Sequence, residues 1–155
     1  MNPRNIVFRV DASLVIGTGH VMRCLTLAEA LRERGCECQF ICREHPGNLI
    51  DQIFERGFKI HRLSSMDVTR GLGQEPHSPA HAAWLGADWR TDATQTRKAM
   101  GDVTVDWLVI DHYAIDERWE RELRPACRRL MVIDDLADRN HDCDLLLDQN
   151  LVEGW

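Results

Sequence analysis

Residues 15–24, VIGTGHVMRC, bring two glycines, a histidine and an arginine together in one short stretch. Gly17 and Gly19 let a backbone turn sharply and let a ligand approach it closely. His20 follows the second glycine directly, and Arg23 lies about one helical turn further on. The stretch could therefore hold a ligand at a turn and present a basic side chain to it.

Two common nucleotide-binding motifs do not fit this stretch. In the dinucleotide fingerprint GxGxxG, the third glycine would fall at position 22, which is Met22. A phosphate-binding P-loop needs Gly-Lys-Ser/Thr, and no such triplet follows. The sequence therefore disfavours a dinucleotide-dependent dehydrogenase and a P-loop kinase.

His20 is the candidate for chemistry as a general base. A histidine in the first turn of a helix faces free N–H groups and the positive end of the helix dipole, which disfavour the protonated ring. A neutral ring can accept a proton, as a general base must. Asp11, at the end of the preceding predicted strand, could hydrogen-bond the other ring nitrogen. The alternative is a histidine that caps or packs locally.

Three further side chains are candidates for binding a ligand. Arg23 could bind a phosphate or sugar oxygen, unless it is a surface or helix-pairing arginine. His112 and Tyr113 follow an apolar run and could line the same pocket. The aromatic ring and hydroxyl of Tyr113 suit a sugar ring; the alternative is a ring that covers the core at the end of a strand.

The metal-ligating residue types do not form a convincing site, so we expect no metal and no cofactor. The cluster of Cys36, Cys38, Cys42 and His45 lacks the paired CxxC of a typical zinc site. Its cysteines are better explained as small buried hydrophobic residues of a strand. Pro79 breaks the helix that a metal pair of His77 and His81 would need. The adjacent Asp134 and Asp135 could hold a divalent ion, but capping of a loop explains them as well.

Apolar runs and helical patterns alternate along the chain, which indicates a parallel sheet covered by helices on both faces. The predicted strands cover 5–10, 36–42, 58–63, 106–111, 129–135 and 143–150. The predicted helices cover 20–34, 48–57, 92–100 and 116–127, with Asn48 as a possible N-cap. Residues 64–92 are irregular and fit either a substrate loop or a surface excursion.

The carboxyl ends of parallel strands share one edge of the sheet, where ligands bind in such folds. Asp11, the glycine turn and His20 follow the first predicted strand, and Asp111, His112 and Tyr113 end or follow the fourth. Further polar residues follow the fifth and sixth strands: Asp134, Asp135, Asp148, Gln149 and Asn150. We therefore expect the site at this edge.

The composition is that of one globular domain. The chain has 155 residues, of which 44% are hydrophobic and 28% charged, and its formal net charge is −6. That charge disfavours binding to nucleic acid or an anionic membrane surface. No apolar run approaches the about 20 residues that span a bilayer, and no secretion signal is recognisable. We expect a cytoplasmic protein with reduced thiols.

Three segments together carry a resemblance to a known family. They are FRVDASLVIGTGHVMRCLTLAEAL (8–31), VIDHYAID (109–116) and VIDDLADRNHDCDLLLDQN (132–150). In this order and spacing, they closely resemble the bacterial UDP-2,4-diacetamido-2,4,6-trideoxy-β-L-altropyranose hydrolases of pseudaminic acid biosynthesis. The glycine–histidine–arginine element alone is shared more widely among glycosyltransferase-like proteins.

The resemblance implies a Rossmann-like domain that forms the N-terminal half of a GT-B architecture. It implies that His20 activates a water molecule, which attacks the anomeric carbon of a UDP-sugar with inversion and releases UDP. It also implies that Tyr113 lies at the sugar, that Gly17 and Gly19 let the substrate approach, and that no metal takes part.

Members of this family continue into a second domain that binds most of the UDP, whereas this sequence ends at LVEGW. We therefore expect residues 1–155 to be the N-terminal domain, with the UDP-binding domain missing and little turnover on its own. Two other functions remain open: a GT-B glycosyltransferase domain and a non-catalytic α/β ligand-binding domain.

Overall fold

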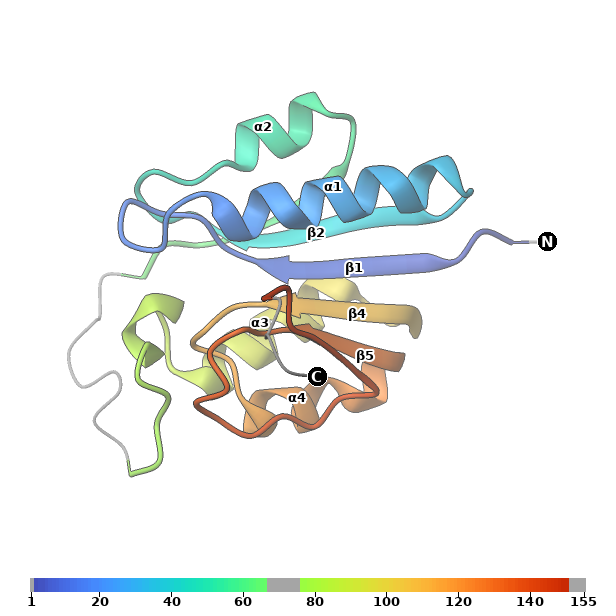
Figure 1. The fold of residues 1–155 in the computed structure, drawn as a ribbon. Helices are drawn as coiled ribbons and strands as arrows, with labels where there is room; N and C mark the ends of the chain where they lie inside the picture. Colours follow the sequence, from blue (N-terminus) through green and yellow to red (C-terminus); the bar gives the residue numbers. More distant parts are fainter. Residues whose placement is uncertain (1, 67–75, 151–155) are drawn as a thin grey trace.

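A computed structural model describes residues 2–66 and 76–150 and shows a six-stranded parallel sheet with the order β3-β2-β1-β4-β5-β6 (Figure 1). The strands are β1 (Asn5–Val10), β2 (Glu37–Arg43), β3 (Lys59–Leu63), β4 (Val105–Asp111), β5 (Cys127–Ile133) and β6 (Leu145–Leu147). The helices are α1 (Gly19–Glu33), α2 (Ile50–Glu55), α3 (Trp89–Met100) and α4 (Glu117–Leu123), with short 3₁₀ turns η1 (Ala82–Leu85) and η2 (Arg124–Ala126). The predicted alternation of strands and helices is confirmed.

The helices cover both faces of the sheet, as Figure 1 shows, and each face has its own core. Alternation along each strand sends neighbouring side chains to opposite faces. In β1, Phe8 packs in the core under α1 and α2, whereas Val7 packs in the core under α3 and α4. Cys42 shares the face of Phe40, as expected for small buried residues.

Local side-chain contacts explain where the observed helices differ from the predicted ones. α3 begins at Trp89 rather than Asp92, because Asp88 caps it by accepting a hydrogen bond from the Thr91 N–H (3.0 Å). Asn48 accepts from the Ile50 N–H (3.0 Å), although Leu49 is the N-cap of α2. α4 ends at Leu123 because Pro125 follows and the chain tightens into η2.

A buried ion network fixes α3 to the middle of the sheet. Asp92 of α3 accepts hydrogen bonds from Arg9 of β1 (2.6 Å, Oδ2) and Arg43 of β2 (2.7 Å). It also accepts from the indole N–H of Trp119 in α4 (2.9 Å). Burial alone would raise the pKa of Asp92, but the adjacent Arg9 guanidinium outweighs it and the pKa is lowered. The carboxylate is therefore ionised and joins three elements to one helix.

Within the described ranges, no helix combines the length and the apolar character that crossing a bilayer requires.

Candidate active site

The glycine turn after β1 delivers His20 to the carboxyl edge of the sheet. The Ser13 hydroxyl accepts hydrogen bonds from the N–H groups of Val15 (3.2 Å) and Ile16 (2.9 Å), and Gly17 N–H closes the turn on the Ser13 carbonyl (2.8 Å). Gly17 has a φ of +84°, which favours glycine. A Cβ on Gly17 or Gly19 would meet no atom within 4 Å, so the described chain leaves the space above the turn open.

His20, the second residue of α1, is held by Asp111 at the end of β4. Its Nδ1 lies 2.5 Å from Asp111 Oδ1. Burial alone would raise the pKa of Asp111, but hydrogen bonds from Arg23 and His20 lower it, so the carboxylate is ionised and can only accept. The proton of a neutral His20 ring therefore lies on Nδ1. Its Nε2 has no partner among the described residues and carries the lone pair.

The guanidinium of Arg23 points toward Asp111 and forms hydrogen bonds with both of its carboxylate oxygens. Its Nε donates to Oδ2 (2.5 Å) and its Nη2 to Oδ1 (2.6 Å), while Nη1 lies 3.4 Å from Gln149 Oε1. Hydrogen bonds in such bidentate arginine–carboxylate pairs are among the stronger ones in proteins. Nη2 also lies 3.2 Å from His20 Nδ1, but the shorter contact of Nδ1 is to the carboxylate. Arg23 therefore fixes Asp111 beneath His20, and its contact with a ligand oxygen stays a prediction.

The expected pairing of Asp11 with His20 is wrong. Asp11 accepts from Arg9 Nη1 (2.7 Å) and the Arg43 N–H (2.7 Å), and its Oδ2 contacts His45 and His112. Strand alternation explains the difference, because Asp11 follows Arg9 on the face turned away from α1. Asp111 follows Val109 on the face that α1 covers.

His112 does not line an open pocket, contrary to expectation. It is buried, its Nε2 lies 2.9 Å from Asp11 Oδ2, and its Nδ1 accepts from the Ala114 N–H (3.1 Å). Burial lowers the pKa of His112, so the ring is neutral and donates through Nε2. His112 therefore fixes Asp11 and the start of the turn after β4, and it is not exposed to a ligand.

Asp11, His45 and His112 also form a possible metal-ligand set, with ligand atoms within 4.8 Å of one another. The ring of His112 argues against that use. Its Nδ1 accepts a backbone N–H, so the proton of the neutral ring lies on Nε2, the atom a metal would need. The hydrogen-bond network accounts for all three side chains.

Tyr113 lies beside His20 at the expected edge of the sheet, and its contact with a sugar stays a prediction. The two rings meet edge to face with 4.5 Å between centroids. The hydroxyl donates to Asp135 Oδ1 (2.5 Å), and burial together with this bond raises the pKa of Tyr113 to about 12. Asp134 instead contacts Arg139 and His141. The adjacent carboxylates of Asp134 and Asp135 therefore bind different side chains.

Sequence reasoning missed two aromatic neighbours of Tyr113, which lie in and next to η1. The His81 ring is 5.9 Å from the Tyr113 ring and 4.2 Å from the Trp84 ring, and Trp84 is 6.2 Å from Tyr113. Only part of the irregular stretch 64–92 can be judged, because 67–75 lie outside the described residues. In the sequence, only the presence of an aromatic residue, Trp84, in a polar loop could have indicated this contact. That pattern predicts little, because the sequence does not show which rings lie next to it.

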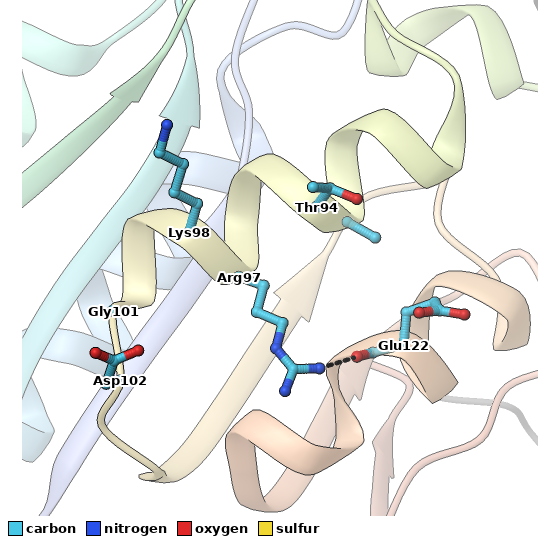
Figure 2. Close-up of a pocket in the computed structure, with 7 residues that line it drawn as sticks. Thr94, Arg97, Lys98, Gly101, Asp102 and Glu122 are labelled. Carbon is cyan, nitrogen blue, oxygen red and sulfur yellow. Dashed lines mark hydrogen bonds between the residues drawn. The ribbon is translucent and has the colours of Figure 1, made fainter.

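A separate hollow of about 370 Å³ lies between α3 and α4 (Figure 2). Gly101 and Asp102, which line it, precede β4, so the hollow is at the opposite edge of the sheet from His20. Arg97, the cation that points toward α4, donates to the Glu122 carbonyl (3.4 Å). We therefore place the candidate site at His20 and not in this hollow.

Comparison with known proteins supports the fold. The structure is similar to MurG of Acinetobacter baumannii, with a TM-score of 0.58 and 16% identity, over 87% of this chain and 36% of that one. The sequence is 24% identical over 129 residues to the uncharacterized protein MJ1062 of Methanocaldococcus jannaschii, covering 83% of this chain and 21% of that protein. No family model matches the chain.

The chain thus spans about a fifth of this relative and about a third of MurG. The likeness to MurG confirms the expected fold class, a Rossmann-like parallel α/β sheet of the kind that forms the N-terminal half of a GT-B architecture.

Proposed function

We propose that this chain is the catalytic half of a UDP-sugar hydrolase, acting on a diacetamido-trideoxy sugar as in pseudaminic acid biosynthesis. The observation that carries the proposal is the His20 ring, which lies beside Tyr113 and is held at Nδ1 by Asp111 (2.5 Å), so that Nε2 is left as an acceptor. The resemblance of residues 8–31, 109–116 and 132–150 to that hydrolase family supports the choice of substrate.

The proposed reaction is a single displacement at the anomeric carbon. His20 Nε2 takes a proton from water while the water oxygen attacks the anomeric carbon and the bond from that carbon to the phosphate oxygen breaks. UDP leaves with the electron pair, and the sugar is released with inverted configuration. The Asp111 carboxylate stabilises the imidazolium that forms, and Arg23 holds Asp111 in place.

A second domain is proposed to complete the cleft and to bind most of the UDP. The chain corresponds to 36% of MurG, and the carboxyl edge that carries His20 is open above the glycine turn. On its own the chain should bind a UDP-sugar weakly.

The proposal is tested by running the reaction of the complete enzyme in water labelled with ¹⁸O. Hydrolysis at the anomeric carbon puts the label in the sugar and leaves UDP unlabelled, and NMR of the first product shows an inverted anomer. Label in the UDP, or transfer of the sugar to another acceptor without free sugar, would count against a hydrolase of this kind.

A further inference from the structure

We propose that His81 and Trp84 form a recognition site for an acetamido group of the sugar, next to the reacting carbon. This inference rests on the proposed function and adds residues to its substrate pocket. It starts from the aromatic wall, which we define as His20, Tyr113, His81 and Trp84. Their rings form one continuous series of contacts, with centroids 4.2 to 6.2 Å apart.

The aromatic wall is assembled from three separate parts of the chain. His20 comes from α1, Tyr113 from the turn after β4, and His81 and Trp84 from η1 and its N-cap. The rings of His81 and Trp84 partly stack on each other, with centroids 4.2 Å apart and planes at 33°, and both lie next to Tyr113 (5.9 and 6.2 Å), which itself contacts His20 (4.5 Å). A ligand whose anomeric carbon faces His20 therefore has its ring substituents within reach of η1.

η1 is fixed to the body of the domain, which makes the wall a preformed surface. Leu85 is only 1% exposed and belongs to the core under α3 and α4, and Trp84 packs against the same core. Gly86 ends η1 with a φ of +74°, and a Cβ there would lie 2.8 Å from His45. Rigid placement of aromatic rings lowers the entropy that is lost when a ligand binds.

The polar atoms of η1 are free for a ligand, within the part of the chain that the structure describes. The indole N–H of Trp84 and both ring nitrogens of His81 have no hydrogen-bond partner there, and both side chains are half-buried. The indole N–H of Trp119, by contrast, donates to Asp92 (2.9 Å). An acetamido group matches this surface, because its methyl can lie on an aromatic face while its carbonyl accepts an N–H.

The experiment compares two UDP-sugars that differ in this one group, UDP-N-acetylglucosamine and UDP-glucose, by NMR titration of the ¹⁵N-labelled chain. The Trp84 indole signal is identified by its loss in Trp84→Phe. We expect UDP-N-acetylglucosamine to shift that signal and to bind about tenfold more tightly than UDP-glucose. Trp84→Ala and His81→Ala should reduce this preference, and Trp107→Phe, at the other end of β4, should leave it intact.

The possible failures are distinct. If both UDP-sugars shift the backbone signals of Gly19 to Arg23 equally, with the Trp84 signal unmoved, the acetamido site is wrong and the proposed function stands. If they shift Trp84 equally and bind equally, the wall contacts the sugar without selecting the acetamido group, which also overturns the inference. If neither UDP-sugar shifts any signal at the carboxyl edge, the acetamido site and the proposed weak binding of a UDP-sugar by this chain are both wrong, whereas the ¹⁸O experiment on the complete enzyme still decides the proposed hydrolysis.

Discussion

At the scale of single residues, Asp111 decides which nitrogen of His20 can act as a base. Its ionised carboxylate accepts from Nδ1 and leaves the lone pair on Nε2. Arg23 is the reason the carboxylate stays in place, because it binds both oxygens of Asp111. The three side chains are linked by hydrogen bonds. A substitution of Asp111 or Arg23 should therefore change the position or the tautomer of the His20 ring.

Replacing Asp111 by asparagine should change the tautomer of His20. An asparagine NH₂ group facing Nδ1 favours the ring with its proton on Nε2, which can no longer accept a proton from water. Long-range ¹⁵N NMR of the imidazole should show Nδ1–H in the wild type and Nε2–H in Asp111→Asn. Steady-state kinetics of the complete enzyme should show kcat lower by about a hundredfold.

The matched control for this prediction is Asp135→Asn, which removes a carboxylate that bonds Tyr113 and not His20. It should leave the His20 tautomer unchanged. An Nδ1–H ring that persists in Asp111→Asn would mean that another group orients His20.

The sequence was sufficient to place His20 and Tyr113 at one edge of the sheet, but it did not identify the partner of His20. Asp11 and Asp111 both end strands on that edge, and the choice between them depends on which face each side chain takes. Strand alternation puts Asp111 on the face of Val109, but only the structure shows that α1 covers this face. The positions of His81 and Trp84 depend on how an irregular loop packs, which no local pattern encodes.

At the scale of elements, buried charge holds α3 against the sheet. Asp92→Ala would leave the guanidinium groups of Arg9 and Arg43 buried without this shared carboxylate. We expect the free energy of unfolding to fall by about 3–5 kcal/mol, as urea denaturation followed by circular dichroism would measure.

A surface pair provides the comparison for Asp92. Asp51 and Arg62 lie 3.4 Å apart with exposed side chains, and Asp51→Ala should change stability little. Equal effects of the two substitutions would contradict the assignment of the buried network as the main anchor of α3.

A pH-sensitive contact fixes the loop between β5 and β6, residues 134–144. His141 Nδ1 contacts Glu120 of α4 (2.7 Å) and its Nε2 contacts Asp134 (2.9 Å), which also binds Arg139. Burial opposes the charged ring, but the hydrogen bond that the ring donates to Glu120, the charge of Glu120 and the hydrogen bond that it donates to Asp134 outweigh burial and raise the pKa of His141 above 6.5. The folded protein therefore binds this proton more tightly than the unfolded chain does.

The sign of the pH dependence follows from that raised pKa. The contribution of His141 to stability is fully present below about pH 6.5 and is lost as the pH rises through the higher folded pKa. The difference in unfolding free energy between the wild type and His141→Gln should thus shrink as the pH rises above about 6.5. A difference that grew with pH would show that the neutral ring is the stabilising form.

The elements themselves were largely predictable, because alternation of apolar runs with helical spacing is a local property of the sequence. The order of the strands was not predicted, since it depends on which elements pack across the sheet. The buried ion network could not be predicted from the sequence either. It joins Arg9, Arg43 and Asp92, which are far apart in sequence and look like ordinary surface charges.

At the scale of the whole molecule, the chain presents one half of a proposed cleft. We expect isolated residues 1–155 to bind a UDP-sugar weakly and to release UDP far more slowly than the complete enzyme. Calorimetry for binding and a coupled assay for UDP release would measure both. Rapid UDP release by the isolated chain would mean that one domain contains the whole active site.

The role of His20 as the base can be measured through the kinetics of His20→Ala in the complete enzyme. The substitution should lower kcat by about a hundredfold or more while the affinity for the UDP-sugar, measured separately by calorimetry, changes little. Tyr113→Phe, which keeps the ring beside His20 and removes its bond to Asp135, should lose far less activity. Turnover that survives in His20→Ala would mean that another group takes the proton from water.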